Sequence, residues 1–305
     1  QIAGEFWLSG SQSYKVMKLA SESLAGRIGI MNMYSLTYQE ILGNLEDIPK
    51  DFSFTTLNSL NTKPKLELNS VFSYIFKGGM PKTIDYTDEM RTEYFKSYIE
   101  TYLMKDIQEL GKITDVVRFK KFLTACASQN ANVINYANLA LASDISQPTA
   151  KEWLSTLQGI GIVYLVQPYF NNSLKRLTKT PKLYFFDTGL LIANLDEESA
   201  EDLRKNRNLG TYKGAIYENL VGQMLKNAGF DLYYYKKENA QLEMDFFVRT
   251  AESLVPVEVK AKDGATASLN NLISFSSYED IRFGIKLGQK NIGFNGKFYT
   301  IPYFC

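Results

Sequence analysis

The chain has 305 residues, of which 45% are hydrophobic and 22% are charged, enough for a core in each of two or three domains. Its 34 basic and 33 acidic residues nearly cancel, so net charge does not support a nucleic-acid function, and any such surface must be a local patch. The absence of histidine excludes histidine general bases, histidine-containing zinc sites, and Ser-His or Cys-His nucleophiles.

Two cysteines, Cys126 and Cys305, are too few for a disulfide framework, and we expect a reducing, cytoplasmic location. No apolar run approaches the roughly 18 residues of a membrane-spanning helix, so we expect no membrane partner. The N-terminus has neither the basic start nor the long apolar region of a signal peptide. Because the chain opens on a run that predicts a strand, EFWLSGS, we expect it to be a fragment of a longer polypeptide.

The first 110 residues predict a strand followed mainly by helices. FWLSGS predicts a buried strand with a small-residue turn, SYKVMKLASESLAGR a helix closing at Gly26, and IGIMNMYSL an apolar run before the short helix YQEILGNL. Residues 47–70 are polar and contain Pro49 and Pro64, and they are predicted to be a connector around weak helical segments. Residues 85–110 predict one long amphipathic helix, whose aromatic stripe we expect to pack inside: Tyr94, Phe95, Tyr98 and Tyr102.

Residues 116–187 have the pattern of a winged helix-turn-helix. Helices are predicted over 116–129, 133–143 and 146–161, followed by a strand over 162–169 and a second wing strand over 177–187. Ser146 suits the N-cap of the third helix, and Pro148 suits its first turn.

Bound to DNA, such a module places its third helix in a major groove and its wing on phosphates. The helix would present Gln147, Thr149 and Lys151, and the wing would present Lys175, Arg176, Lys179 and Lys182. The alternative is a winged helix used only for packing or for contacts with a partner protein, in which the basic wing is a solvated loop.

A polar, charged stretch over 196–208 indicates a domain boundary. The rest of the chain predicts a mixed sheet with a helix before it and a helix after it, a compact α/β unit. In order, the expected elements are a helix (214–229), strands (231–237, 242–248 and 254–261), a helix (268–278), a strand (281–287) and a final hairpin (290–304).

Charged side chains in these strands predict a site. Alternation along 242–248 places Asp245 on the opposite face from its immediate neighbours, and Glu258 and Lys260, two apart, share one face. If the two strands pair, the three side chains converge. Paired carboxylates can bind magnesium or manganese, and a lysine beside them can position or deprotonate a water. Glu218, on the preceding helix, adds a further carboxylate.

The order helix Glu, strand Asp and strand Glu-x-Lys resembles the PD-(D/E)xK nuclease superfamily, whose chemistry needs no histidine. The resemblance implies that Glu218, Asp245 and Glu258 hold the metal ion and that Lys260 assists the attacking water. The alternative is a nuclease-like fold in which these residues form a surface salt-bridge cluster or bind a ligand without cleaving it.

Nearly the whole chain resembles a group of bacterial and archaeal AAA-type ATPases that carry C-terminal helical and nuclease-like regions. The most specific stretches are SQPTAKEWLSTLQGIGIVYLVQPY, KTPKLYFFDTGL, GAIYENLV, LEMDFFV and VPVEVKA. The resemblance also implies a phosphate-sensing role for Ser9 or Ser11 and a nucleotide-sensing or finger role for Arg27. The phosphate loop of that group, Gly-x4-Gly-Lys-Ser/Thr, does not occur in this sequence. Either the chain is a fragment or its ATPase has been lost, and ATP binding is expected only in a longer form.

We therefore expect an α/β chain in three parts: the C-terminal remnant of an AAA ATPase core (1–48), a helical region with a winged helix-turn-helix (49–195) and a PD-(D/E)xK nuclease-like mixed α/β domain (196–305). The leading expectation is a DNA-associated ATPase-family protein with metal-dependent phosphodiester hydrolysis. The alternative is a non-catalytic module for regulation or assembly that binds DNA, a partner protein or further copies of itself.

Overall fold

A computed structural model describes most of the chain after residue 30. The described residues are 10, 29, 31–43, 56–57, 68–103, 105, 107, 113, 115–170, 179–195, 199–205, 210–237, 242–250, 253–261, 266–275, 281–288 and 293–302. Ser9, Ser11, Arg27, Lys175 and Arg176 lie outside them, so the roles expected for these five residues stay predictions.

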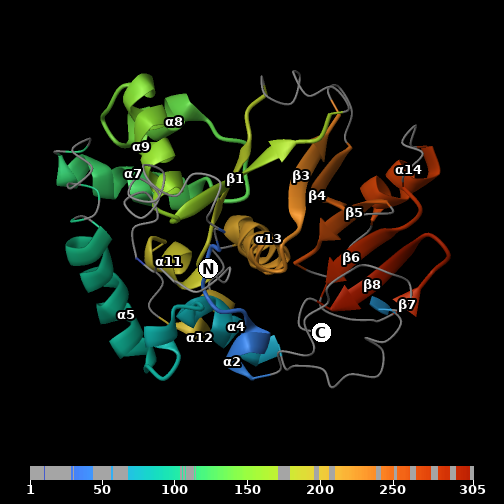
Figure 1. Cartoon of the computed structure of the whole chain (residues 1–305), viewed down its shortest axis with the longest axis horizontal. Coiled ribbons are helices and arrows are strands. Elements are labelled where there is room, and N and C mark those ends of the chain that lie inside the picture. Colours follow the sequence, from blue (N-terminus) through green and yellow to red (C-terminus); the bar gives the residue numbers. More distant parts are fainter. Residues whose placement is uncertain are drawn as a thin grey trace, which may run out of the picture.

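The described residues form a mixed α/β structure around one eight-stranded sheet (Figure 1). The order across the sheet is β2-β1-β3-β4-β5-β6-β8-β7, with parallel pairs β1–β3, β5–β6 and β6–β8 and antiparallel pairs elsewhere. The α/β class expected from the sequence is thus confirmed. The strands are β1 (Val163–Pro168), β2 (Lys182–Phe185), β3 (Asp231–Lys236), β4 (Glu243–Arg249), β5 (Leu254–Val259), β6 (Gly284–Gly288), β7 (Gly293–Phe294) and β8 (Phe298–Pro302).

The sheet crosses the boundary that we expected at residue 196. β1 runs parallel to β3, with Gln167 opposite Tyr233 and Pro168 opposite Tyr234, and the Tyr169 amide donates to the Tyr234 carbonyl at 2.7 Å. The two expected wing strands, β1 and β2, therefore extend the sheet of the C-terminal region. Residue 196 does not separate two sheets.

Helices cover both faces of the sheet. α13 (Gly210–Asn227) shares a hydrophobic core with Phe246, Val255 and Val257, while α14 (Ala267–Phe275) packs on the opposite face with Leu254 and Phe298. Figure 1 shows α13 at the centre, between the helical region and strands β3–β5, and α14 at the far side from the helical region. The helix–strand order expected for residues 214–304 is confirmed where the structure describes it.

The helical region lies beside β1 and β2 (Figure 1). Its helices are α4 (Leu68–Lys77), α5 (Asp88–Ser97), α7 (Val116–Ser128), α8 (Tyr136–Ala142), α9 (Gln147–Gly159), α11 (Thr188–Ala193) and α12 (Ala200–Lys205), with the short helix α2 (Tyr38–Ile41) at its edge. The start expected for α9 is confirmed, because the Thr149 amide donates to the Ser146 hydroxyl at 3.2 Å and Pro148 lies in the first turn. Trp153 of α9 packs edge-on against Phe119 and Phe122 of α7.

Three expectations about helices need correction. The long helix expected over 85–110 begins later, at Asp88, and passes without a break from α-helical to π-helical turns at Tyr98, the latter reaching Leu103. The polar stretch 196–208 contains α12, whose Leu203 is fully buried, and the connector expected over 47–70 gives way to α4 at Leu68. Packing of the aromatic stripe is confirmed at Phe95, which is fully buried.

Candidate functional site

Glu218 projects from α13 toward β2 rather than toward a solvent-exposed edge. Two stripes of α13 face the sheet and the helical region: Ile216, Tyr217, Leu220 and Val221 are buried apolar residues, and Gly222 lies against Tyr164 and Phe246. A Cβ at position 222 would stand 2.6 Å from the Tyr164 hydroxyl, so glycine lets the helix approach the strands closely. This close approach carries Glu218 into the interior.

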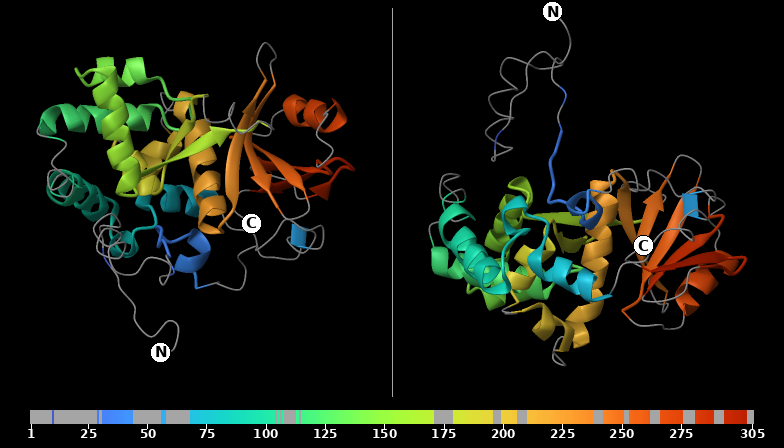
Figure 2. Two further views of the ribbon diagram at one scale, coloured as in Figure 1. Left: turned by 45° about the horizontal axis from the view of Figure 1, so that its top comes forward. Right: turned by 90° about the horizontal axis from the view of Figure 1, so that it is seen from below.

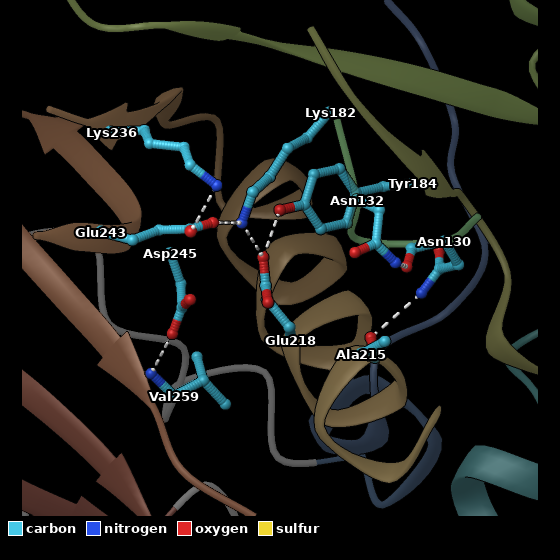
Figure 3. A network of polar contacts seen from close by, with 10 residues as sticks. All are labelled: Asn130, Asn132, Lys182, Tyr184, Ala215, Glu218, Lys236, Glu243, Asp245 and Val259. Carbon is cyan, nitrogen blue, oxygen red and sulfur yellow. Dashed lines mark hydrogen bonds and ion pairs between the residues drawn. The ribbon is translucent and has the colours of Figure 1, made fainter. Parts of the chain in front are cut away.

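An ion-pair network that reaches from the interior to the surface surrounds Glu218 (Figure 3). The Lys182 ammonium donates to Glu218 Oε1 at 3.0 Å, and the Tyr184 hydroxyl donates to the same oxygen at 2.5 Å. Lys182 Nζ also lies 3.3 Å from Glu243 Oε1, while Glu243 Oε2 accepts from Lys236 at 3.0 Å. We call these five residues the Lys182 network.

Lys182 is not the phosphate-binding wing residue that we expected. Its side chain is 3% exposed, and its charge is directed at Glu218 and Glu243. The assignment was wrong because β2, although it is the edge strand of the sheet, has all four residues buried and is not an open wing strand. Sequence analysis also missed Tyr184, Glu243 and Lys236 as members of a site. A lysine opening an otherwise apolar four-residue strand was the available signal.

The surroundings of the Lys182 network keep Lys182 and Glu243 charged and Tyr184 neutral. Burial opposes the ammonium of Lys182, but the attraction of Glu218, Asp245 and Glu243 outweighs it and raises the lysine pKa above its ordinary value. Burial together with Glu218 raises the pKa of Tyr184 far above its ordinary value, so Tyr184 stays a neutral donor. Glu243 has a lowered pKa because the lysines beside it outweigh its partial burial.

Asp245 lies at a bulge in β4, which the expected strict alternation did not include. β3 and β4 pair Tyr233 with Phe247 and Tyr235 with Met244, so Asp245 and Phe246 together face the single Tyr234. Such a bulge re-aims a side chain. Phe246 packs against Tyr184, and the Asp245 carboxylate also lies on the α13 side of the strand (Figure 3).

Asp245 is held by the backbone of β5 and not by a cation. Its Oδ2 accepts from the Val259 amide at 2.7 Å. Burial, reinforced by repulsion from Glu218, raises the pKa of Asp245 to about 8, although Lys182, the Val259 amide and Lys260 act in the opposite direction. At neutral pH this carboxyl group is therefore largely protonated.

Glu258 and Lys260 pair with each other, as their two-residue spacing predicts. Lys260 Nζ lies 2.7 Å from Glu258 Oε1, and the Glu258 side chain is 5% exposed. The other oxygen, Glu258 Oε2, is buried and has no hydrogen-bond partner among the described residues. Lys260 also lowers the pKa of Asp245.

Each predicted carboxylate thus has a different partner, and alternation along β5 places Glu258 on the α14 face with Leu254. Glu218 accepts a hydrogen bond from Lys182, Asp245 accepts one from the Val259 amide, and Glu258 forms an ion pair with Lys260. Over the described residues, no three acidic or cysteine side chains are arranged to hold a metal ion. The three-carboxylate magnesium or manganese site stays a prediction.

The three residues expected on the recognition helix lie where they were placed. Gln147 and Lys151 are exposed and Thr149 is half-buried, all in the first turns of α9. The Thr149 hydroxyl is 2.7 Å from that of Ser146, and Lys151 Nζ lies 5.3 Å from the centroid of the Tyr136 ring. Lys179, expected on the wing, is exposed at the edge of the described residues.

The helices that the structure describes include none with both the length and the apolar composition needed to cross a membrane.

Comparisons with known proteins give two family matches and two relatives. Residues 68–201 match a family described as Domain of unknown function (DUF8612), and residues 213–305 match Domain of unknown function (DUF4143). The chain is 28% identical over 261 residues to "Uncharacterized protein Rv2008c" of Mycobacterium tuberculosis and, at the same identity, to "Uncharacterized protein Mb2031c" of Mycobacterium bovis.

These alignments cover 85% of this chain and 53% of each relative, so the chain spans about half the length of the curated relatives that it matches. No solved structure gives a significant match. The two family matches meet between residues 201 and 213, close to α12.

Proposed function

We propose that this chain is a non-catalytic, DNA-binding part of a DNA-associated AAA-type ATPase. One observation carries the non-catalytic half of the proposal: of the three carboxylates expected to hold a metal ion, Glu218 is already paired with the buried ammonium of Lys182. Its Nζ is within 3.0 Å of Glu218 and 3.3 Å of Glu243.

A divalent ion would have to compete with this lysine. Glu218 Oε1 already accepts two hydrogen bonds, and a second cation beside a 3%-exposed ammonium would meet strong repulsion in a region of low dielectric constant. Metal ligands must also be deprotonated, and Asp245, with a pKa of about 8, has to lose its proton first. Both effects disfavour hydrolysis at this place.

The DNA-binding half of the proposal rests on the first turns of α9. Gln147 and Lys151 are exposed at the N-terminal end of the third helix of a helical unit, the end that reads bases in a winged helix-turn-helix. Lys179 would supply a phosphate contact from the neighbouring segment. Because the net charge is only +1, the contact would be a local patch, with few phosphates neutralised.

The ATPase part of the proposal rests on the sequence resemblance. Ser9, Ser11 and Arg27 would sense bound nucleotide in a longer form of the protein that includes a phosphate loop. Within the present sequence, which lacks that loop, ATP would not be hydrolysed.

Manganese calorimetry tests the non-catalytic half. We expect no saturable binding in the intact protein at micromolar to low-millimolar metal, and the same result in Asp245→Ala. Saturable binding that disappears in Asp245→Ala would overturn the proposal. It would support the alternative, in which Glu218, Asp245 and Glu258 hold magnesium or manganese and Lys260 assists a water in cleaving a phosphodiester.

Fluorescence anisotropy with a labelled DNA duplex tests the DNA-binding half. We expect affinity that weakens steeply with salt and that falls about tenfold in Lys151→Glu. Lys237→Glu, on an exposed lysine after β3, is the matched control and should change affinity much less. Binding that is indifferent to salt, or equal effects of the two variants, would instead favour a winged helix that contacts protein.

A further inference from the structure

The outer face of α9 presents a carboxylate next to a lysine. Lys151, Glu152 and Ser155 are exposed and lie within about one helical turn of each other. The opposite face of the helix is buried and consists of Ala150, Trp153, Leu154, Thr156 and Leu157. Figure 2 shows the green helices of this unit at the end of the molecule opposite the red strands, in both views. Lys151 and Glu152 are thus accessible to a partner.

Neither of these two charges is neutralised by a neighbour of opposite sign. Among the residues that the structure describes, none forms an ion pair or a hydrogen bond with the Glu152 carboxylate. The Lys151 ammonium lies 5.3 Å from the centroid of the Tyr136 ring, a contact that leaves its positive charge in place. A negative and a positive group therefore stand next to each other on this face.

The basic residues of the neighbouring helix α7 differ from Lys151 in being paired. Arg118 Nη2 lies 3.2 Å from Asp144 Oδ2. Lys120 Nζ lies 2.8 Å from Glu100 Oε1. Because paired cations neutralise fewer phosphates, contacts with the DNA backbone contribute less to affinity here, and contacts with bases have to contribute more.

A carboxylate on such a face favours one base in particular. Phosphates repel it, so its presence costs affinity unless it accepts a hydrogen bond from the DNA. In the major groove the donors are the amino groups of cytosine and adenine, and on adenine the acceptor N7 lies next to the amino group and would repel the second carboxylate oxygen. Cytosine is therefore the better partner for Glu152. Guanine, with the two acceptors O6 and N7, is the better partner for Lys151.

We propose that α9 recognises a G·C-containing site, with Lys151 donating to guanine and Glu152 accepting from the N4 amino group of cytosine. Glu152 is the residue that makes binding selective, because its carboxylate disfavours every site that offers no donor. This inference rests on the proposed DNA-binding role of α9 and adds the base pairs that the helix prefers. Adjacent residues point about 100° apart around a helix, so the two side chains reach adjoining positions in the groove.

Selection of duplexes from a randomised library by the intact chain, followed by fluorescence anisotropy, tests this proposal. We expect one cytosine position at which replacing C·G by T·A weakens binding at least about tenfold. In Glu152→Gln the same replacement should change affinity by about twofold or less. The ratio of the two affinities removes the general gain from deleting a negative charge. Glu93→Gln, at a 74%-exposed glutamate on α5, is the matched control and should keep the tenfold preference.

The results that would overturn this inference differ from those that would overturn DNA binding itself. If Lys151→Glu weakens binding but the cytosine preference is absent, or persists in Glu152→Gln, α9 binds DNA without base recognition by Glu152. The inference then fails and the proposed DNA-binding role stands. If the intact chain binds none of the duplexes, the DNA-binding role fails and this inference fails with it.

Discussion

The side-chain amide of Asn219 pairs with both backbone groups of Phe185. The Phe185 amide donates to Asn219 Oδ1 at 2.8 Å, and Asn219 Nδ2 donates to the Phe185 carbonyl at 3.1 Å. A residue of α13 thus takes the place of a neighbouring strand at the end of β2. Together with the Lys182–Glu218 ion pair, one turn of α13 fastens the helical region to the C-terminal region.

Replacing Asn219 should therefore weaken the whole fold. Asn219→Leu leaves two buried backbone groups of Phe185 without partners, and each unpartnered group costs about 1–3 kcal/mol. We expect a loss of about 2 kcal/mol or more in the free energy of unfolding, measured by urea denaturation. Asn138→Leu, at an exposed position on α8, is the control and should change it by less than about 0.5 kcal/mol. Equal effects would show that the Phe185 contact is unimportant.

The Lys182 network predicts that the stability of the fold depends strongly on Lys182. Lys182→Met leaves the buried Glu218 without its cation, and breaking a buried pair from one side costs about 3–5 kcal/mol. The double variant Lys182→Met/Glu218→Leu should recover much of that loss, because no unpaired charge remains. Lys236→Met is the control: this lysine is 56% exposed, and its pairing should contribute less than about 1 kcal/mol. Additive losses in the double variant would contradict a coupled pair.

The raised pKa of Asp245 predicts that the free energy of unfolding falls as pH rises. Its pKa is about 8 in the folded chain and about 3.9 in an unfolded one, so between these values the folded state binds the extra proton. The contribution of Asp245 to the free energy of unfolding is fully present below about pH 4. It is lost as pH rises from about 4 to 8, by up to about 1.4 kcal/mol per pH unit. Asp245→Asn keeps an acceptor for the Val259 amide and should flatten the profile. A wild-type profile that matches that of Asp245→Asn would refute the shift.

Two glycines of α13 should respond to alanine with opposite signs. A Cβ at Gly222 would stand 2.6 Å from the Tyr164 hydroxyl and 2.9 Å from Phe246 Cζ, so Gly222→Ala should destabilise the chain by about 1–3 kcal/mol through overpacking. Gly214 is exposed with nothing within 4 Å of such an atom. Gly214→Ala should stabilise the helix by about 0.5–1 kcal/mol. Thermal unfolding distinguishes them, and a shift of the same sign in both would be contrary to this packing.

Local signals in the sequence were sufficient for much of the fold. Ser146 and Pro148 located the start of α9, and alternation with turn residues located β3, β4 and β5. α4 was missed although Val71, Tyr74 and Ile75 have helical spacing, because the polar residues before it suggested a connector. Each of these signals involves residues close together in the chain, so it can be recognised from the sequence alone.

The site depended on partners far apart in the chain. Lys182 appeared to be a surface residue because its partners, Glu218 and Glu243, lie 36 and 61 positions away and only the fold brings them together. The orientation of Asp245 depends on a bulge opposite Tyr234, in a different strand. Alternation within one strand contains no information about an extra residue in its pairing.

The parallel pairing of β1 with β3 restricts where the polypeptide can be divided. A fragment starting at Gly210 would include the whole DUF4143 match but would leave β3 as an outer strand, with backbone groups at Tyr233 and Tyr234 no longer hydrogen-bonded. Exposed strands of this kind recruit strands from other molecules. The fragment would therefore be prone to aggregate or to exchange strands, and the segments matched by two separate families would have to be produced together to keep this edge of β3 paired.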